Sequence, residues 1–267
     1  MLEPEIVFRA FPNVPPGFRR AILREYLQLK VLDFVFGRMT AAGLVFMGGS
    51  AIHLFHGSDR FSEDLDFDSR GVSANGFATL AHAVAREFEL EGVACSCSAG
   101  SPRNASTAVL RFVGILQAWG LTAHRDEVLR LKLDAAPQEF PCQPDMSVLN
   151  RLDVICSVPV MPPGLLLSHK LRAILERNRL MGRDIYDASC LFGFTTPDMA
   201  YLEEKCGLSS PGEVVSAVKA RLGRTRQATL EGDVAPFITS SRNLLRMSLF
   251  PATLDRWVDN KAGRLGR

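Results

Sequence analysis

The chain has 267 residues, of which 47% are hydrophobic and 22% are charged, and its net charge is +2. This length can hold one large domain or two small ones, and this composition excludes a disordered or fibrous chain. The near balance of charge does not by itself indicate nucleic-acid binding, and no apolar stretch reaches the roughly 18 to 20 residues that span a membrane.

The N-terminal segment MLEPEIVFRAFPNVPP carries acids and prolines where a signal peptide needs basic residues followed by an apolar core. We therefore expect a cytoplasmic protein. The six cysteines lack CxxC spacing and a nearby histidine pair, which argues against a zinc site. They are expected to be thiols in a reducing compartment.

The first elements follow from apolar periodicity. Residues 17–38 predict an amphipathic helix that begins after two prolines. Residues 44–47 predict a short strand that ends at a Gly-Gly pair, and residues 50–55 are typical of a helix start. Residues 64–67 alternate as a second strand should.

The rest of the chain predicts a helix at 76–90, strands at 93–98, 106–116, 128–135 and 152–158, and then helices at 164–178, 183–192, 197–206, 212–222 and 241–260. The predicted fold class is α+β, with a mixed sheet flanked by helices and a helical C-terminal region. We place an N-terminal helix and the sheet core in residues 1–160, and the helical region in residues 161–267.

Two aspartates flank one leucine in the second predicted strand. Because side chains alternate between the faces of a strand, Asp64 and Asp66 are expected on one face, with Leu65 and Phe67 in the core. Two carboxylates this close repel unless they are protonated or bridged by a cation. A hard divalent ion such as Mg²⁺ or Mn²⁺ prefers such oxygen ligands and commonly serves phosphoryl or nucleotidyl transfer.

The Gly-Gly-Ser turn offers a complementary feature. Gly48 and Gly49 would let the backbone approach a phosphate closely. Ser50, at the start of a helix, would offer its hydroxyl beside free backbone amides. The turn and the two carboxylates together favour the binding of a triphosphate with its metal ion.

The segment GGSAIHLFHGSDRFSEDLDFDSRG, residues 48–71, resembles the first motif of the nucleotidyltransferase superfamily, most closely that of the AbiEii toxin family. The resemblance implies that Asp64 and Asp66 hold metal and that the Gly48-Gly49-Ser50 turn and Ser62 contact the nucleotide. It extends over roughly residues 20 to 192. The matching residues of this motif are Gly48, Gly49, Ser50, Ser62, Glu63, Asp64, Leu65, Asp66 and Phe67.

A later segment, SHKLRAILERNRLMGRDIYDASCLF, resembles the family's second motif. That likeness implies that Lys170 neutralises triphosphate charge and that Asp184 or Asp187 is a further functional carboxylate. Of the two, we assign nucleotide binding to Asp184 and catalysis to Asp187. The helical region would thus complete the active site. Independently of the resemblance, Lys170 falls inside the apolar arc of its predicted helix, so it must reach solvent or meet an anion. Reaching solvent, or a structural ion pair with Asp187, is the alternative to phosphate binding. Asp184 could instead cap its helix.

The superfamily usually has a third strand carboxylate. In Leu131-Lys132-Leu133-Asp134, alternation puts Lys132 and Asp134 on the face away from the leucines, which makes Asp134 our candidate metal ligand. Asp153 competes for this role.

The predicted function is a Mg²⁺-dependent nucleotidyltransferase toxin of a toxin-antitoxin or phage-defence system. By resemblance, it transfers a nucleotide from an NTP to the 3′ end of tRNA and has a cognate antitoxin as partner. A small-molecule nucleotidyltransferase, as in antibiotic modification, and a non-catalytic NTP-binding module are the alternatives. The basic runs at 219–226 and 261–267 could contact RNA phosphates or could be solvated helix faces.

Overall fold

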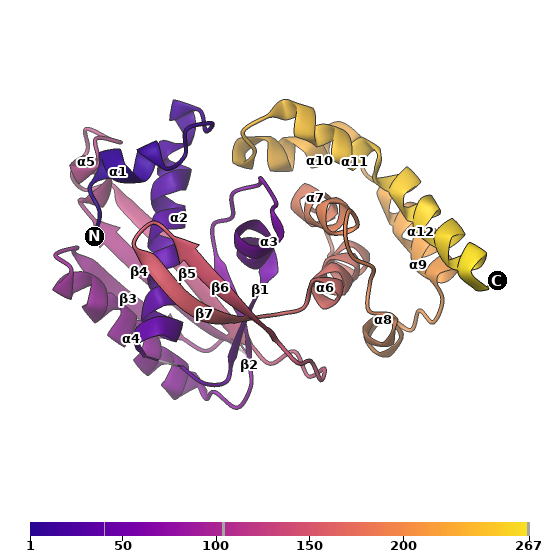
Figure 1. The fold of residues 1–267 in the computed structure, drawn as a ribbon, viewed down its shortest axis with the longest axis horizontal. Helices are drawn as coiled ribbons and strands as arrows, with labels where there is room; N and C mark the ends of the chain where they lie inside the picture. The colour runs from indigo at the N-terminus through magenta and orange to yellow at the C-terminus, as the bar shows by residue number, and fades with distance from the viewer. Residues whose placement is uncertain (40, 103–104, 266–267) are drawn as a thin grey trace. The chain divides into compact units, whose positions relative to one another are not determined.

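The computed structural model describes residues 1–39, 41–102 and 105–265. The chain forms two compact units (Figure 1), which we call the sheet unit and the helical unit. The sheet unit contains Met1–Phe55 and Phe61–Met161, and the helical unit contains His56–Arg60 and the chain from Pro162 onward. The short segment His56–Arg60 therefore belongs with helices that follow it by more than a hundred residues, which the sequence did not indicate.

A mixed seven-stranded sheet with the order β3-β4-β5-β2-β1-β7-β6 organises the sheet unit. The pairs β2/β5 and β1/β7 are parallel, and the other neighbours are antiparallel. This confirms the predicted fold class. The strands are β1 Leu44–Met47, β2 Leu65–Ser69, β3 Cys95–Gly100, β4 Ser106–Val113, β5 Val128–Ala136, β6 Asp145–Arg151 and β7 Val154–Val160.

One face of this sheet is the core face. Leu65 and Phe67 of β2 and Leu131 and Leu133 of β5 are all buried, as alternation requires. Helix α2 contacts β5 and β7, and α4 contacts β3 and β4 (Figure 1). The helical elements of the sheet unit are α1 Pro4–Arg9, η1 Pro16–Phe18, α2 Arg19–Leu32, the π-helical turn η2 Asp33–Arg38, α3 Gly48–His56, whose last residue belongs to the helical unit, α4 Ala74–Leu90 and α5 Ile115–Ala118.

The helical unit is built on α6 and α7, which pack against each other. Of the helices in the described residues, none is long and apolar enough to cross a membrane. The elements of this unit are α6 Pro163–Glu176, α7 Gly182–Leu191, α8 Met199–Cys206, α9 Pro211–Leu222, α10 Gln227–Val234, η3 Ala235–Phe237, η4 Ser241–Leu244, α11 Leu245–Ser248 and α12 Phe250–Leu265.

Several elements differ from the prediction: strand β6 and helices α1, α5 and α10 were not predicted, and the predicted strand at 106–116 ends at Val113. Strand β6 was not predicted, because only Leu149 in it is buried and its sequence shows no clear apolar alternation. Helix α10 was missed for a similar reason, since it buries only Leu230 and Val234. The single helix predicted at 241–260 is broken into η4, α11 and α12, and α12 restarts at Phe250 with Pro251 in its first turn, where the missing N–H is tolerated.

Candidate active site

The DLDF segment has the geometry that its alternation predicted. Asp64 immediately precedes β2, and Asp66 is the second residue of the strand. Both aspartates are partly exposed, whereas Leu65 and Phe67 are buried in the core. The carboxylates therefore lie on the face opposite the core, which we call the acidic face and define by Asp66 and Asp134.

Asp134 is the register partner of Asp66 on the neighbouring parallel strand β5, so the two carboxylates leave the sheet side by side. The carboxylate of Asp134 accepts hydrogen bonds from Thr107 Oγ1 at 2.7 Å and from Lys132 Nζ at 2.5 Å. The competing candidate, Asp153, lies in the turn between β6 and β7. It accepts hydrogen bonds from Tyr26 Oη and Lys30 Nζ, so it is not beside Asp66.

Lys132 is a residue of the acidic face to which the sequence assigned no role. Its pKa is raised, first by the hydrogen bond to Asp134 and also, against the opposing effect of burial, by the negative charges of Asp134, Asp64 and Asp66. One ammonium group thus offsets part of the charge of three carboxylates. The alternating Leu-Lys-Leu-Asp pattern was the signal that could have identified it.

The acidic face suits a hard divalent cation by its chemistry, because its donors are carboxylate oxygens. Within residues 1–39, 41–102 and 105–265, however, no three His, Cys, Asp or Glu side chains converge closely enough to hold a metal ion by themselves. Mg²⁺ is usually bound by one or two carboxylates together with water and substrate phosphates. The residues therefore fit a metal that is held jointly with a triphosphate, and they do not form a closed metal site.

The turn after β1 is shaped by contact with Asp66. Gly48 has φ of 78°, and a Cβ on this residue would collide with Oδ2 of Asp66 and lie 2.9 Å from its Cβ. The hydroxyl of Ser50 is buried and donates a hydrogen bond to the backbone carbonyl of Asp64. Gly48 and Ser50 thus fix the two ends of the Asp64–Asp66 segment against the start of α3.

The first four N–H groups of a helix have no partner within it, so the N–H groups at the start of α3, from Gly48 onward, are not bonded inside the helix. Gly49 is buried. The backbone carbonyl of Ser62 accepts a hydrogen bond of 3.0 Å from Gln28 Nε2, which anchors the approach to β2. Contacts of Gly49, Ser50 and Ser62 with a nucleotide stay predictions.

The substitution Gly48→Ala tests this packing. We expect it to lower both stability and transfer activity, because the new Cβ adds strain at positive φ, of the order of 1–3 kcal/mol, and also displaces the Asp66 carboxylate. Gly71→Ala is the matched control, since Gly71 has φ of 76° but a Cβ added there would meet no atom within 4 Å. Chemical unfolding and transfer assays of both variants measure the difference, and equal losses in the two would contradict the Asp66 contact.

The helical unit contains an ion cluster that is built around two buried carboxylates. Lys170 Nζ lies 2.9 Å from Asp187 Oδ2 and 3.1 Å from Asp184 Oδ1. Arg60 binds Asp187 with two hydrogen bonds, from Nε at 2.8 Å and from Nη2 at 2.9 Å, and Arg177 Nε lies 3.0 Å from Asp184 Oδ2. We call these five residues the Lys170 cluster. Both of its carboxylates are almost fully buried.

The pKa values of Lys170 and Asp187 are determined by the opposite charges around them in the cluster. Burial by itself would lower the pKa of Lys170, but the charges of Asp187 and Asp184 outweigh burial and raise it. Burial would likewise raise the pKa of Asp187, and the charges of Arg60 and Lys170 instead hold it below its ordinary value. Three cations against two carboxylates leave the cluster with one excess positive charge near neutral pH.

The cluster decides two alternatives that the sequence left open. Lys170 meets anions within the protein rather than reaching only into solvent. The interpretation of Asp184 as a helix cap is wrong, because Met181 is the N-cap of α7 and Asp184 lies in the first turn, bonded to Lys170. Arg60 was missed, since its partner Asp187 is 127 residues away and no local pattern connects them.

The basic run at 219–226 is only partly available to a polyanion. Lys219 pairs with Asp255 at 2.5 Å, and Arg221 donates to the backbone carbonyls of Ile174 and Arg177 at the end of α6. Arg224 and Arg226 are exposed. In the second basic run, 261–267, residues 266–267 and the side chains before them lie outside the described part of the chain.

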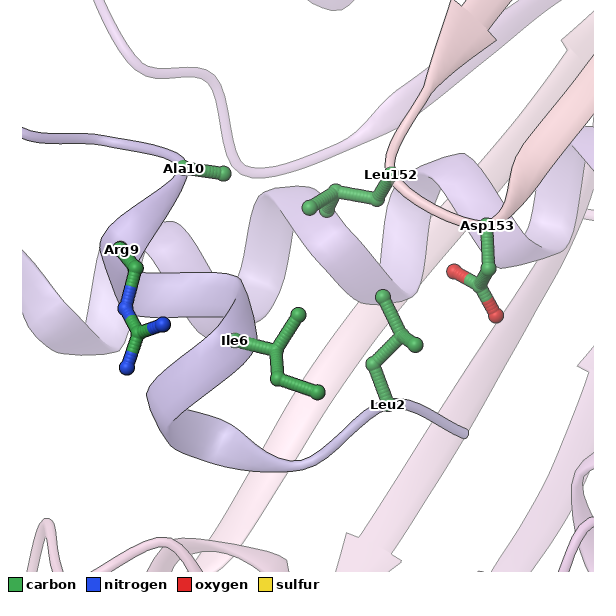
Figure 2. A pocket seen from close by; sticks show the side chains of 6 residues that line it. All are labelled: Leu2, Ile6, Arg9, Ala10, Leu152 and Asp153. Atoms are coloured by element: carbon green, nitrogen blue, oxygen red, sulfur yellow. The ribbon is translucent and has the colours of Figure 1, made fainter.

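An apolar pocket of about 520 Å³ is lined by residues of the N-terminal segment and of the β6–β7 turn, with Asp153 at its edge (Figure 2). Because Asp153 is already bonded to Tyr26 and Lys30, this pocket presents no free carboxylate for a metal triphosphate. Its lining residues are Leu2, Ile6, Arg9, Ala10, Leu152 and Asp153.

Comparisons with known proteins bear on the family and the fold of the chain. A family model described as nucleotidyl transferase AbiEii toxin, type IV TA system, matches residues 40–209. The fold is similar to that of a protein from H. pylori assigned as a nucleotidyltransferase, with a TM-score of 0.54 and 17% identity over 90% of this chain and 97% of that chain. It is also similar to JHP933 from Helicobacter pylori, with a TM-score of 0.52 and 16% identity over 92% and 97%.

No curated protein matches this sequence. At the identities of the two solved structures, the likeness shows the fold alone. The family model, in contrast, spans more than half of the chain and includes the Gly-Gly-Ser turn, the DLDF strand and the Lys170 helix. The chain therefore belongs to the AbiEii family of nucleotidyltransferase toxins of type IV toxin-antitoxin systems.

Proposed function

We propose that this nucleotidyltransferase uses Mg²⁺ or Mn²⁺ to transfer a nucleotide from an NTP to the 3′ end of tRNA in the cytoplasm, and that a cognate antitoxin protein restrains it. The observation that carries the metal dependence is the register of Asp66 opposite Asp134 on two parallel strands, with Asp64 on the same face. The antitoxin rests on the family to which the chain belongs, and the tRNA acceptor rests on the resemblance of the sequence motifs alone.

The acidic face supplies the residues for metal and nucleotide binding. Asp64, Asp66 and Asp134 would hold the metal, which when bound neutralises triphosphate charge and stabilises the leaving pyrophosphate. The turn at Gly48 and Gly49 would bring free amides of α3 to the phosphates. Lys132 limits the repulsion among the carboxylates before the substrate arrives.

The Lys170 cluster supplies a cation in the helical unit. Its excess positive charge and the 12% exposure of the Lys170 side chain favour contact with an anionic substrate. We propose that Lys170 binds phosphate and that Asp184 and Asp187 position its ammonium group. This assignment gives the two carboxylates a positioning role, where the sequence had suggested nucleotide binding for Asp184 and catalysis for Asp187.

We expect Lys170→Met to weaken NTP binding or transfer by about ten- to a hundredfold, because a charge-assisted contact to phosphate is worth roughly 1.5–3 kcal/mol. Lys219→Met is the matched control, since Lys219 pairs with an exposed aspartate. NTP titrations and transfer rates, measured where both variants remain folded by circular dichroism, separate binding from stability. Equally small effects of the two changes would show that Lys170 does not bind the phosphates.

The direct test of the function is incubation with each labelled NTP and purified tRNA, with Mg²⁺ or with EDTA, followed by a denaturing gel. Metal-dependent labelling of tRNA supports the proposal. Pyrophosphate release without labelled RNA, in the presence of candidate small hydroxyl compounds, would support the small-molecule acceptor. NTP binding without any pyrophosphate release would identify a binding module.

If the acceptor is RNA, the exposed arginines of the first basic run, residues 219–226, should contribute to RNA binding. We expect Arg224→Ala combined with Arg226→Ala to weaken RNA binding and to reduce the slope of log K against log salt by about 1 to 2, while NTP binding is unchanged. Arg221 is kept because it bonds the end of α6. Filter binding over a salt series measures the slope, and an unchanged slope would argue against this surface as an RNA contact.

A further inference from the structure

Strand β6 is an edge strand with an unusual exposed surface. It lies at one end of the sheet, and in the described part of the chain its only strand partner is β7 (Figure 1). Met146 and Val148 of β6 are 64% and 69% exposed, and Ile155 of β7 is 70% exposed. Natural proteins usually protect such edges with charges, prolines or covering segments, since an exposed apolar edge strand invites pairing with another strand.

The three apolar side chains share one face of the sheet. Val148 is opposite Ser157, and Ile155 is opposite Asn150, so alternation puts Met146, Val148 and Ile155 on the same side. Leu149, which points to the other side, is 2% exposed. We call Met146, Val148 and Ile155, together with the β6 backbone, the edge patch.

The sequence of β6 is complementary to itself. Asp145 is the first residue of the strand and Arg151 is the last, and Val148 lies midway between them. If a second copy of β6 pairs antiparallel about Val148, each Asp145 stands opposite Arg151 of the partner subunit. Opposite charges then meet at both ends, and valine meets valine at the centre.

The side chain of Arg151 is compatible with such a contact. Its Nη1 lies 2.7 Å from Glu25, and 37% of the side chain is exposed, so further guanidinium donors can meet a second carboxylate. Cross-strand pairs of opposite charge and of β-branched residues each stabilise an antiparallel ladder by a modest amount, and the backbone hydrogen bonds add to them.

We propose that the edge patch is a homodimer interface, in which two copies of β6 pair antiparallel about a two-fold axis through Val148 and join two sheets into one. The interface is isologous, because the same residues contribute from both subunits. It is formed by the sheet unit and does not depend on the acceptor that the enzyme uses.

Site-specific crosslinking tests both the interface and its register. With Val148→Cys, the two introduced thiols face each other across the axis, within reach of a disulfide after small adjustment. With Met146→Cys, the two thiols are four residues out of register, or about 13 Å apart along the strands, and cannot bond. Both sites are exposed, so neither change should impair folding.

The full-length variants and the wild-type protein, which controls for the six native cysteines, are oxidised with diamide and run on non-reducing gels. Light scattering of the reduced wild-type protein gives the mass. We expect a mass of twice 29.4 kDa and a crosslinked dimer only in Val148→Cys. A monomeric mass, a dimer in which Val148→Cys does not crosslink, or equal crosslinking of Met146→Cys would each overturn the proposal.

Discussion

Asp66→Asn is expected to reduce nucleotide transfer by at least about 100-fold while the protein stays folded. Loss of residues that only support a metal ligand typically costs 10- to 100-fold in metal affinity or activity, and Asp66 is proposed as a direct ligand. Asparagine keeps the shape that packs against Gly48. Because it also removes one of three neighbouring negative charges, the melting temperature without metal should be unchanged or raised.

The structure provides a matched control for this experiment. Asp134→Asn should resemble Asp66→Asn, because the two carboxylates are register partners. Asp153→Asn should retain transfer activity, since Asp153 is bonded to Tyr26 and Lys30. Transfer rates over a Mg²⁺ titration compare the three variants. Wild-type rates in Asp66→Asn, or equal losses in all three, would contradict the proposed metal ligands.

Asp187→Asn is expected to destabilise the protein by about 3–5 kcal/mol. Asp187 is fully buried and pairs with both Arg60 and Lys170, so its neutralisation leaves the buried Arg60 and the largely buried Lys170 without their shared anion. Asp255→Asn is the matched control, because Asp255 forms an exposed pair with Lys219, which is worth at most about 1 kcal/mol. Urea unfolding at neutral pH measures both changes, and a difference below about 1 kcal/mol between them would contradict the cluster's role.

The same variant has a characteristic pH dependence. The pKa of Asp187 is lower in the folded protein than in the unfolded chain, so its stabilisation is complete above the unfolded value of about 4 and is lost as the pH falls toward the folded value. The stability difference between wild type and Asp187→Asn should therefore be constant from pH 7 to about 5 and shrink at lower pH. Unfolding curves down to pH 3 test this, and a constant difference throughout would show that ionised Asp187 is not the cause.

Several features of the site could be predicted from the sequence because they depend on local geometry. Alternation along a strand determined that Asp64 and Asp66 share a face, and helical periodicity determined that Lys170 lies within an apolar arc, where it must reach solvent or meet an anion. Each of these follows from residues within a few positions of one another.

Long-range pairing could be decided only by the tertiary structure. Asp134 and Asp153 are both strand-associated aspartates, and only the β2/β5 register placed Asp134, 68 positions after Asp66, beside it. Strand β6 has little apolar alternation. Its pairing with β7 defines it as a strand, and that pairing cannot be read from its own sequence.

Arg60 is the clearest example of a long-range pairing that could not be predicted from the sequence. Its local sequence resembles a polar loop, yet its guanidinium is buried and binds Asp187, 127 residues later. A charge can be buried only where an opposite charge compensates for lost hydration, and that partner is supplied by packing rather than by neighbouring sequence. Sequence periodicity therefore determined the faces of the strands and helices, and the tertiary structure alone decided which distant charges meet.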